Sequence, residues 1–186
     1  AMSSYKGETM TMKHITRIES VRGNDYYATP VEATDALLGV ERFHGSIWEP
    51  CCGEGHISKR LLEKGFDVES TDLVDRGFGQ SSIDCLMERE VRDNIITNPP
   101  FKLATQIARH FQYLSTGKVA LLLKLSFLEG KERKGLFTDF PPARVWVFSK
   151  RVSLMKNGEV YSGGMMALAW FVWEKGLKQD PRVGWI

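Results

Sequence analysis

The segment Asn98-Pro99-Pro100-Phe101 has the clearest chemical potential in the sequence. Two successive prolines remove two backbone N–H donors, stiffen the chain and keep the preceding residue, Asn98, out of the helical conformation. The segment therefore presents an amide side chain and neighbouring carbonyl oxygens rigidly, followed by an aromatic ring. Carbonyl oxygens accept the hydrogens of a neutral amine, and the ring can stack on a planar group. The alternative is a structural turn, with Asn98 capping a helix and Phe101 in the core.

A glycine-containing loop, Glu49-Pro50-Cys51-Cys52-Gly53-Glu54-Gly55, lies where we expect a strand to pass into a helix. Glycines let the backbone approach a ligand closely, and ligands of open α/β sheets bind at the carboxyl ends of strands. Ser58 stands where the three-glycine dinucleotide fingerprint has its third glycine. Glu49 would repel a pyrophosphate, so the loop favours a ligand with a cationic group. A purely structural strand-to-helix turn is the alternative.

An acidic residue, Asp72, follows the next expected strand, 17 residues after Gly55. A carboxylate at this place can accept hydrogen bonds from both hydroxyls of a ribose. An isolated Asp at a strand end more often forms a turn. Together with the glycine loop, however, Asp72 favours a nucleoside-containing ligand.

Alternating helical and strand patterns predict the elements that position these residues. Thr29-Pro30-Val31-Glu32 is typical of a capping box with proline at the first helical position, so we expect a helix from Thr29 to about Phe43. Helical spacing recurs around Ile57 to Leu62 and from Leu103 to Leu114. Strands are predicted at residues 46–49, 67–71, 94–97 and 118–124. This alternation indicates an α/β fold with a mostly parallel sheet covered on both faces.

Two later apolar stretches, residues 144–148 and 166–173, predict further strands. The polar segment between them contains Asn157-Gly158 and Gly163-Gly164, which are turn signals, so we expect an antiparallel hairpin at the end of the sheet. Residues 1–24 lack a sustained period and are expected to form a flexible arm. Residues 25–186 then form a single domain.

Composition and charge exclude several classes of protein. The chain has 186 residues, of which 42% are hydrophobic and 26% charged, as in a folded soluble domain. The longest apolar run has nine residues, too short for a membrane span, and no secretory signal is evident. Three cysteines and four histidines show no metal-ligand spacing, so we expect no metal site, and free thiols fit a reducing cytoplasm.

Charge is distributed unevenly along the chain. From Ser46 to Asn98, eleven acidic residues outnumber six Lys and Arg, whereas from Lys124 to Lys156 eight Lys and Arg outnumber three acidic residues. A polyanion would favour the basic segment. An uneven solvated surface is the alternative.

Taken together, the glycine loop, Asp72 and Asn98-Pro99-Pro100-Phe101 resemble the motifs of S-adenosylmethionine-dependent amino-methyltransferases, particularly the DNA adenine-N6 enzymes. Tyr27-Ala28-Thr29-Pro30 resembles their N-terminal cofactor motif, and its position corresponds to the gamma-class motif order. Residues 27–173 look similar to compact phage or prophage enzymes, which act in a bacterial host cytoplasm. The resemblance implies a Rossmann-like class I methyltransferase fold, with a mostly parallel seven-stranded sheet, a terminal antiparallel hairpin and helices on both faces.

The resemblance also implies roles for individual residues. Asp84 would accept a hydrogen bond from the cofactor's adenine amine, although Cys85 departs from the bulkier residue that the family often has next to it. The implied catalytic residues are Asn98, Pro99, Pro100 and Phe101. The implied cofactor-binding residues are Tyr27, Thr29, Pro30, Glu49, Pro50, Cys51, Gly53, Gly55, Asp72, Leu73, Asp84 and Asn98.

Duplex or single-stranded DNA is the implied partner. We expect basic residues to contact its phosphates: Lys131, Arg133, Lys134, Arg144, Lys150, Arg151 and Lys156. Phe148 is a candidate second stacking ring, although a core position is more typical. Gamma-class enzymes with long recognition sequences usually carry a separate recognition domain, whereas 13 residues follow Trp173 here. We therefore expect relaxed sequence specificity.

Three other functions share parts of this pattern. An adenine-N6 methyltransferase acting on structured RNA has the same catalytic motif. A protein-glutamine methyltransferase is a weaker alternative, because those enzymes resemble Asn-Pro-Pro-Tyr more closely. A non-catalytic nucleic-acid-binding module could keep the fold, but its catalytic motif should be broken, and here it is intact.

Overall fold

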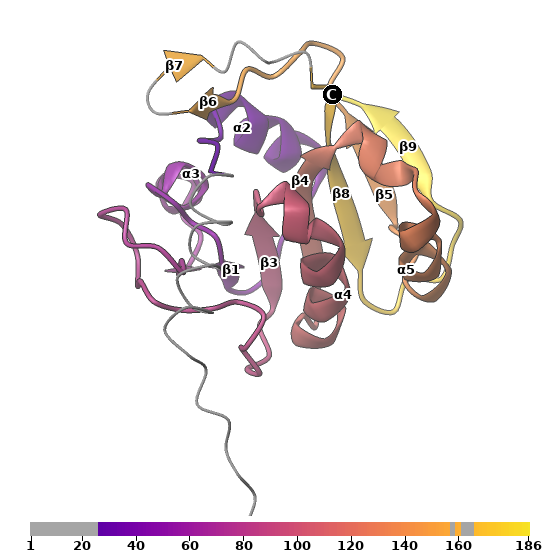
Figure 1. Cartoon of the computed structure of the whole chain (residues 1–186), viewed down its shortest axis with the longest axis horizontal. Helices are drawn as coiled ribbons and strands as arrows, with labels where there is room; N and C mark the ends of the chain where they lie inside the picture. The colour runs from indigo at the N-terminus through magenta and orange to yellow at the C-terminus, as the bar shows by residue number, and fades with distance from the viewer. Residues whose placement is uncertain (1–25, 157–158, 161–165) are drawn as a thin grey trace, which may run out of the picture.

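A central seven-stranded sheet organises the chain (Figure 1). The computed structural model describes residues 26–156, 159–160 and 166–186. The strand order is β2-β1-β3-β4-β8-β5-β9. The strands are β1 (Ile47–Glu49), β2 (Val68–Ser70), β3 (Asn94–Thr97), β4 (Lys118–Lys124), β5 (Arg144–Val147), β8 (Leu168–Glu174) and β9 (Arg182–Trp185).

Seven helical segments lie within the described residues, and all but the first follow a strand. The α-helices are α2 (Val31–Val40), α3 (His56–Glu63), α4 (Ala104–Leu114) and α5 (Lys134–Asp139). Short 3-10 turns are η1 (Phe101–Leu103), η2 (Leu125–Leu128) and η3 (Lys131–Arg133). The longest described helix, α4, has 11 residues, so none of the helices that the structure describes is long enough to span a bilayer.

All strands of the sheet are parallel except β8, which pairs antiparallel with both β4 and β5. The expected antiparallel pair is therefore present, with β5 and β8 as its members. The segment between them contains β6 (Met155–Lys156) and β7 (Glu159–Val160), which form a separate two-stranded sheet. The turn signals Asn157-Gly158 and Gly163-Gly164 and the arm expected at residues 1–24 lie outside the described residues.

Two hydrophobic layers cover the sheet, one on each face. Strand β4 shows why, since Leu121 and Leu123 join one cluster while Ala120 and Leu122 join the other. Alternate side chains of a strand point to opposite faces. The first cluster includes residues of α4 and α5, and the second includes residues of α2 and α3. The expected cover of helices on both faces is confirmed.

The start of α2 differs from the sequence-based expectation. Pro30 is the N-cap with extended backbone, and no side chain caps the helix. Thr29 lies one residue before the cap, and its hydroxyl accepts a hydrogen bond from the Asn98 side chain at 3.0 Å. The helix ends at Val40, three residues before Phe43. The Thr29 hydroxyl, which the sequence predicted to cap the helix, therefore makes a tertiary contact with Asn98.

One predicted phosphate contact is also wrong. Arg144 donates hydrogen bonds to Glu41 and Glu174, and Glu41 is 3% exposed. Lys118 and the indole N–H of Trp146 donate to the same Glu41 carboxylate, at 2.7 and 2.8 Å. These donors hold the Glu41 pKa below its ordinary value despite burial, which raises it. Arg144 therefore belongs to a structural ion-pair network.

Candidate active site

Three of the chemically interesting segments meet where β2, β1 and β3 end. These strands are parallel neighbours, so their carboxyl ends lie on one edge of the sheet. From β1 the chain passes through α3 to β2 on one side, while β3 lies on the other side. The loops on the two sides of β1 consequently diverge, which opens a crevice at this point of the sheet. The glycine loop, Asp72 and Asn98 surround that crevice.

The glycine loop after β1 has a backbone that only glycine adopts readily. Gly53 and Gly55 have φ of +55° and +80°. A Cβ on Gly53 would lie 2.1 Å from the Tyr26 ring, and one on Gly55 would lie 2.3 Å from the Phe78 ring. The two glycines therefore let aromatic side chains pack directly on the loop.

Asp72 is oriented by backbone hydrogen bonds to both of its carboxylate oxygens. Gly53 N–H donates to Oδ2 at 2.8 Å, and Val74 N–H donates to Oδ1 at 2.9 Å. The contact with Gly53 joins the end of β2 to the glycine loop after β1. Each oxygen keeps a further lone pair, so the carboxylate can still accept hydrogen bonds from a ligand's hydroxyl groups.

Glu49 is the buried acid of the site. Its side chain accepts hydrogen bonds from the Ser58 backbone N–H at 2.8 Å and from the Ser58 hydroxyl. Desolvation is the main cause that raises its pKa to about 8, and the nearby Asp72 raises it further, while the Ser58 bonds lower it. Glu49 is therefore largely protonated near neutral pH, and a cationic group placed beside it would favour its ionised form.

Asn98 has a defined amide orientation. Its Nδ2 donates to the Tyr27 carbonyl oxygen and to Thr29 Oγ1, both at 3.0 Å. These two bonds use both amide hydrogens, so Oδ1 is the remaining polar atom of the side chain. The N-terminal segment thus fixes the amide of Asn98, a residue that lines the crevice, and leaves Oδ1 as its remaining acceptor.

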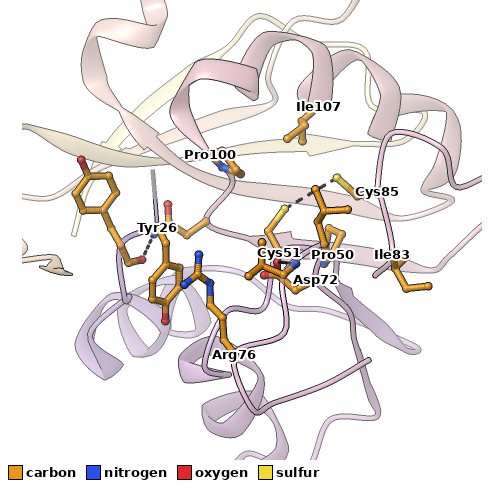
Figure 2. Close-up of a pocket in the computed structure, with 13 residues that line it drawn as sticks. Tyr26, Pro50, Cys51, Asp72, Arg76, Ile83, Cys85, Pro100 and Ile107 are labelled. Atoms are coloured by element: carbon orange, nitrogen blue, oxygen red, sulfur yellow. Dashed lines mark hydrogen bonds between the residues drawn. The ribbon is translucent and has the colours of Figure 1, made fainter. Parts of the chain in front are cut away.

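The main cavity at the crevice has walls from both sides of β1 (Figure 2). Cys51 and Cys85 face one another in its wall, with their sulfur atoms 4.0 Å apart. Both are free thiols. The lining residues are Tyr26, Tyr27, Pro50, Cys51, Asp72, Leu73, Val74, Arg76, Ile83, Cys85, Asn98, Pro100 and Ile107.

A smaller cavity adjoins the main one and shares Tyr26, Tyr27, Cys51 and Asn98 with it. Its other lining residues are Ala28, Thr29, Glu49, Cys52, His56 and Ile57. His56 was not anticipated as a site residue, because a single histidine at the start of a helix carries no sequence signal. The one feature of the sequence that could have indicated His56 is its position directly after Gly55, the last residue of the glycine loop.

Phe101 lies between this crevice and a further cavity. Its ring stacks on Tyr27 with centroids 5.8 Å apart and planes inclined by 22°. The Lys124 ammonium lies 5.0 Å from the Phe101 centroid, and the Arg133 guanidinium lies 5.2 Å from the Phe127 centroid. This cavity, the acceptor cavity below, is lined by Phe101, Lys102, Ala104, Leu123, Lys124, Ser126, Phe127 and Arg133.

The remaining predicted residues lie around these cavities or apart from them. Pro99 is buried, and Asp84 accepts a hydrogen bond from Leu86 N–H, while its neighbours Ile83 and Cys85 line the main cavity. Pro30 lies apart, in a groove that Phe148, Lys150 and Arg151 also line. Lys131 and Lys134 are exposed near Arg133. Lys156 belongs to β6, and its side chain lies outside the described part.

No protein-family model matches the chain, and no curated protein matches its sequence. Several solved structures are similar in fold. A candidate RNA methyltransferase from Pyrococcus horikoshii has a TM-score of 0.64 at 15% identity, over 91% of this chain and 100% of that chain. The modification subunit of a candidate type I restriction enzyme from Vibrio vulnificus has a TM-score of 0.59 at 12% identity, over 94% of this chain and 50% of that chain.

A third similar structure is the magnesium protoporphyrin IX methyltransferase from Synechocystis with bound S-adenosylmethionine. Its TM-score is 0.50 at 14% identity, over 92% of this chain and 87% of that chain. At identities of 12–15%, these comparisons show that the folds are similar. The chain has the Rossmann-like class I methyltransferase fold, which confirms the fold class predicted from the sequence.

Proposed function

We propose that this protein is a methyltransferase that uses S-adenosylmethionine to methylate the exocyclic N6 amine of adenine in DNA. The observation that carries the proposal is the orientation of Asn98. Both of its amide hydrogens are bound by the N-terminal segment, so Oδ1 is left to accept a hydrogen from a ligand's amine. The motif resemblance, the fold and the crevice beside Asp72 support it.

The residues at the crevice fit this cofactor. Asp72 would accept hydrogen bonds from the ribose hydroxyls, and Leu73 and Ile83 offer apolar surface to the adenine. Glu49, buried and close to the smaller cavity, suits the ammonium of the methionine end. When bound, the cofactor supplies a methyl group activated by a positively charged sulfur.

Asn98 and Pro99 would activate the acceptor amine. The lone pair of an adenine N6 is delocalised into the ring, which makes the amine a weak nucleophile. Hydrogen bonds from N6 to Asn98 Oδ1 and the Pro99 carbonyl oxygen favour the tetrahedral geometry in which that lone pair is available. The same oriented dipoles stabilise the positive charge that develops on nitrogen. No strongly basic side chain is required for this step.

The acceptor cavity supports a nucleotide substrate. Phe101 and Phe127 supply aromatic surface, and Lys102, Lys124 and Arg133 supply positive charge. None of the described residues that line this cavity carries a carboxylate. Aromatic rings stack on bases at about 1–3 kcal/mol each, and cations bind the phosphates. A base in a duplex reaches such a cavity only after flipping out of the stack, at a cost of a few kcal/mol.

Methylation of adenine N6 in RNA is the second candidate. The Pyrococcus horikoshii structure, named for RNA, favours it, whereas the Vibrio vulnificus restriction-modification subunit favours DNA. The charges of the acceptor cavity suit both polymers equally, because each presents the same phosphates.

The direct test uses tritiated S-adenosylmethionine with unmethylated duplex DNA, single-stranded DNA and ribosomal RNA. We expect label in N6-methyldeoxyadenosine after digestion, and its loss in Asn98→Ala. Lys124→Gln should raise KM for DNA, while Lys178→Gln, an exposed residue between β8 and β9, serves as the matched charge control. Label in RNA alone would support the second candidate. Label in neither polymer would refute both.

A further inference from the structure

The groove that contains Pro30 shares no lining residue with the three cavities of the candidate active site. It has a volume of about 380 Å³, which is enough for a nucleotide-sized ligand. One wall comes from the start of α2 and includes Glu32, and the other comes from the segment after β5, with Phe148, Lys150 and Arg151. This groove, the β5 groove below, has no part in the proposed methyl transfer.

The β5 groove lies at the same edge of the sheet as the acceptor cavity. β4 and β5 both pair antiparallel with β8, so their carboxyl ends lie together. At that edge Leu168 of β8 pairs with Lys124 on one side, and its carbonyl oxygen accepts a hydrogen bond from Phe148 N–H on the other, at 3.4 Å. Neighbouring strands are about 4.8 Å apart, so the backbones of Lys124 and Phe148 are separated by about 10 Å along the edge.

This separation suits two positions on one nucleic-acid strand. Lys124 lines the acceptor cavity and Phe148 lines the β5 groove. A stacked strand rises about 3.4 Å per nucleotide, so it covers 10 Å in about three nucleotides, and in fewer where it is unstacked. Residues of α4 line the acceptor cavity and residues of α2 line the groove, so the strand would cross the edge from one face of the sheet to the other.

The groups that line the β5 groove match the parts of a nucleotide. Phe148 packs against the second hydrophobic cluster and also lines the groove, so the core holds its ring in place. Lys150 and Arg151 are exposed, and residues 144–156 contain no acidic residue. Aromatic rings stack on bases of any sequence, and Lys and Arg neutralise phosphates. Glu32 is the acidic side chain in the lining, and it should oppose a phosphate placed nearby.

We infer that the β5 groove binds a flanking nucleotide of the strand that carries the target base, with Phe148 stacked on its base and with Lys150 and Arg151 on its phosphates. The inference rests on the proposed function and deepens it, because it assigns a part of the substrate outside the acceptor cavity. Deoxyadenosine 5′-monophosphate would fill the acceptor cavity alone. A longer strand would occupy the groove as well and gain affinity there.

The test compares a single-stranded DNA dodecamer that contains one central adenine with deoxyadenosine 5′-monophosphate. Fluorescence anisotropy gives the Kd of the labelled dodecamer, and competition against it gives the Kd of the monophosphate. Phe148→Leu removes the ring, Phe148→Tyr keeps it, and Lys150→Gln and Glu32→Gln each remove one charge of the groove. Lys178→Gln is the matched control, because this exposed residue follows β8 at the opposite edge of the sheet.

We expect Phe148→Leu to weaken dodecamer binding about 5- to 50-fold, as for one lost base stack, and Phe148→Tyr to keep the wild-type affinity. Lys150→Gln should lower the slope of log Kd against log salt by about 0.7, because one phosphate contact is lost, whereas Lys178→Gln should leave the slope unchanged. Glu32→Gln should strengthen dodecamer binding about two- to fivefold, since it removes a negative charge from beside the phosphates. None of these variants should change the affinity for the monophosphate by more than about twofold.

Equal losses for the dodecamer and the monophosphate, or a dodecamer affinity that Phe148→Leu leaves unchanged, would overturn the inference and leave the proposed function standing. Polyglutamate that binds as tightly as the dodecamer, with the same loss in Phe148→Leu, would assign the groove to an acidic protein and would also overturn the inference. A wild-type protein that binds neither the dodecamer nor the monophosphate would overturn the inference and the proposed function together.

Discussion

Glu49→Gln should change how stability depends on pH. In the folded protein the Glu49 pKa is raised to about 8, mainly by burial, whereas in the unfolded chain it lies near its ordinary value of about 4.5. Between these values the folded state holds a proton that the unfolded state has lost. The free energy of unfolding therefore falls as pH rises through this window, by about 1.4 kcal/mol per pH unit and by about 3–5 kcal/mol in total.

The glutamine variant lacks this proton and therefore lacks this pH dependence. Its side-chain oxygen can still accept the two Ser58 hydrogen bonds that Glu49 accepts. We expect the variant to match the wild-type protein in stability near pH 5 and to exceed it by about 3–5 kcal/mol near pH 9. Urea unfolding at pH 5, 7 and 9 measures the difference, with the denaturant slope checked at each pH.

The exposed carboxyl of Glu63, on the same helix as Ser58, provides the control. Its side chain is 63% exposed, so Glu63→Gln removes a carboxyl from the same helix without removing a buried one. Parallel pH profiles for Glu49→Gln and the wild-type protein would refute the reasoning, because they would mean that Glu49 ionises in the folded state as easily as in water. A profile that rises with pH would refute the direction of the shift.

Three further changes test other contacts. Glu41→Ala should lower the free energy of unfolding by about 3–5 kcal/mol, because it removes the buried carboxylate that pairs with Lys118 and Arg144. A loss below about 1 kcal/mol in urea unfolding would contradict this. Gly53→Ala and Gly65→Ala should each cost about 1–2 kcal/mol of stability, because both glycines have positive φ. Only Gly53→Ala, whose Cβ meets the Tyr26 ring, should also weaken binding of S-adenosylhomocysteine. Equal affinities of the two variants in calorimetry would contradict this. Thr29→Val should lower the methyl-transfer rate about 5- to 10-fold, because it removes the acceptor of one Asn98 amide hydrogen. Thr34→Val is the control, since its buried hydroxyl has no hydrogen-bond partner among the described residues, and it should leave the rate unchanged. Equal rates for the two variants would show that the bond to Thr29 does not orient Asn98.

The central strands were predictable because burial on both faces leaves a strong local signal. β3 and β4 have the predicted bounds, since a strand covered on both faces is an uninterrupted apolar run between polar ends. α5 and β9 were not predicted. α5 has six residues and β9 has four, of which three are exposed, so neither carries enough of a period to be recognised.

The site was predictable in its parts but not in its connections. Proline, glycine and acidic residues at strand ends are local signals, and they indicated Asn98, the glycine loop and Asp72. The orientation of Asn98 depends on Thr29, 69 residues earlier in the chain, and sequence reasoning had assigned that hydroxyl to a helix cap. Local chemistry indicated which groups to consider, while a distant partner decided the hydrogen bond.

The sequence by itself determined the α/β architecture, the central strands and the residues around the crevice, because backbone stiffness, apolar periodicity and residue chemistry act over a few neighbouring positions. Only the tertiary structure decided the states of those groups. It buried Glu49 and so raised its pKa, bound the amide nitrogen of Asn98 to Tyr27 and Thr29, and paired Arg144 with Glu41. Burial and hydrogen-bond partnership arise from residues far apart in the chain, and they exist only once the sheet has brought those residues together.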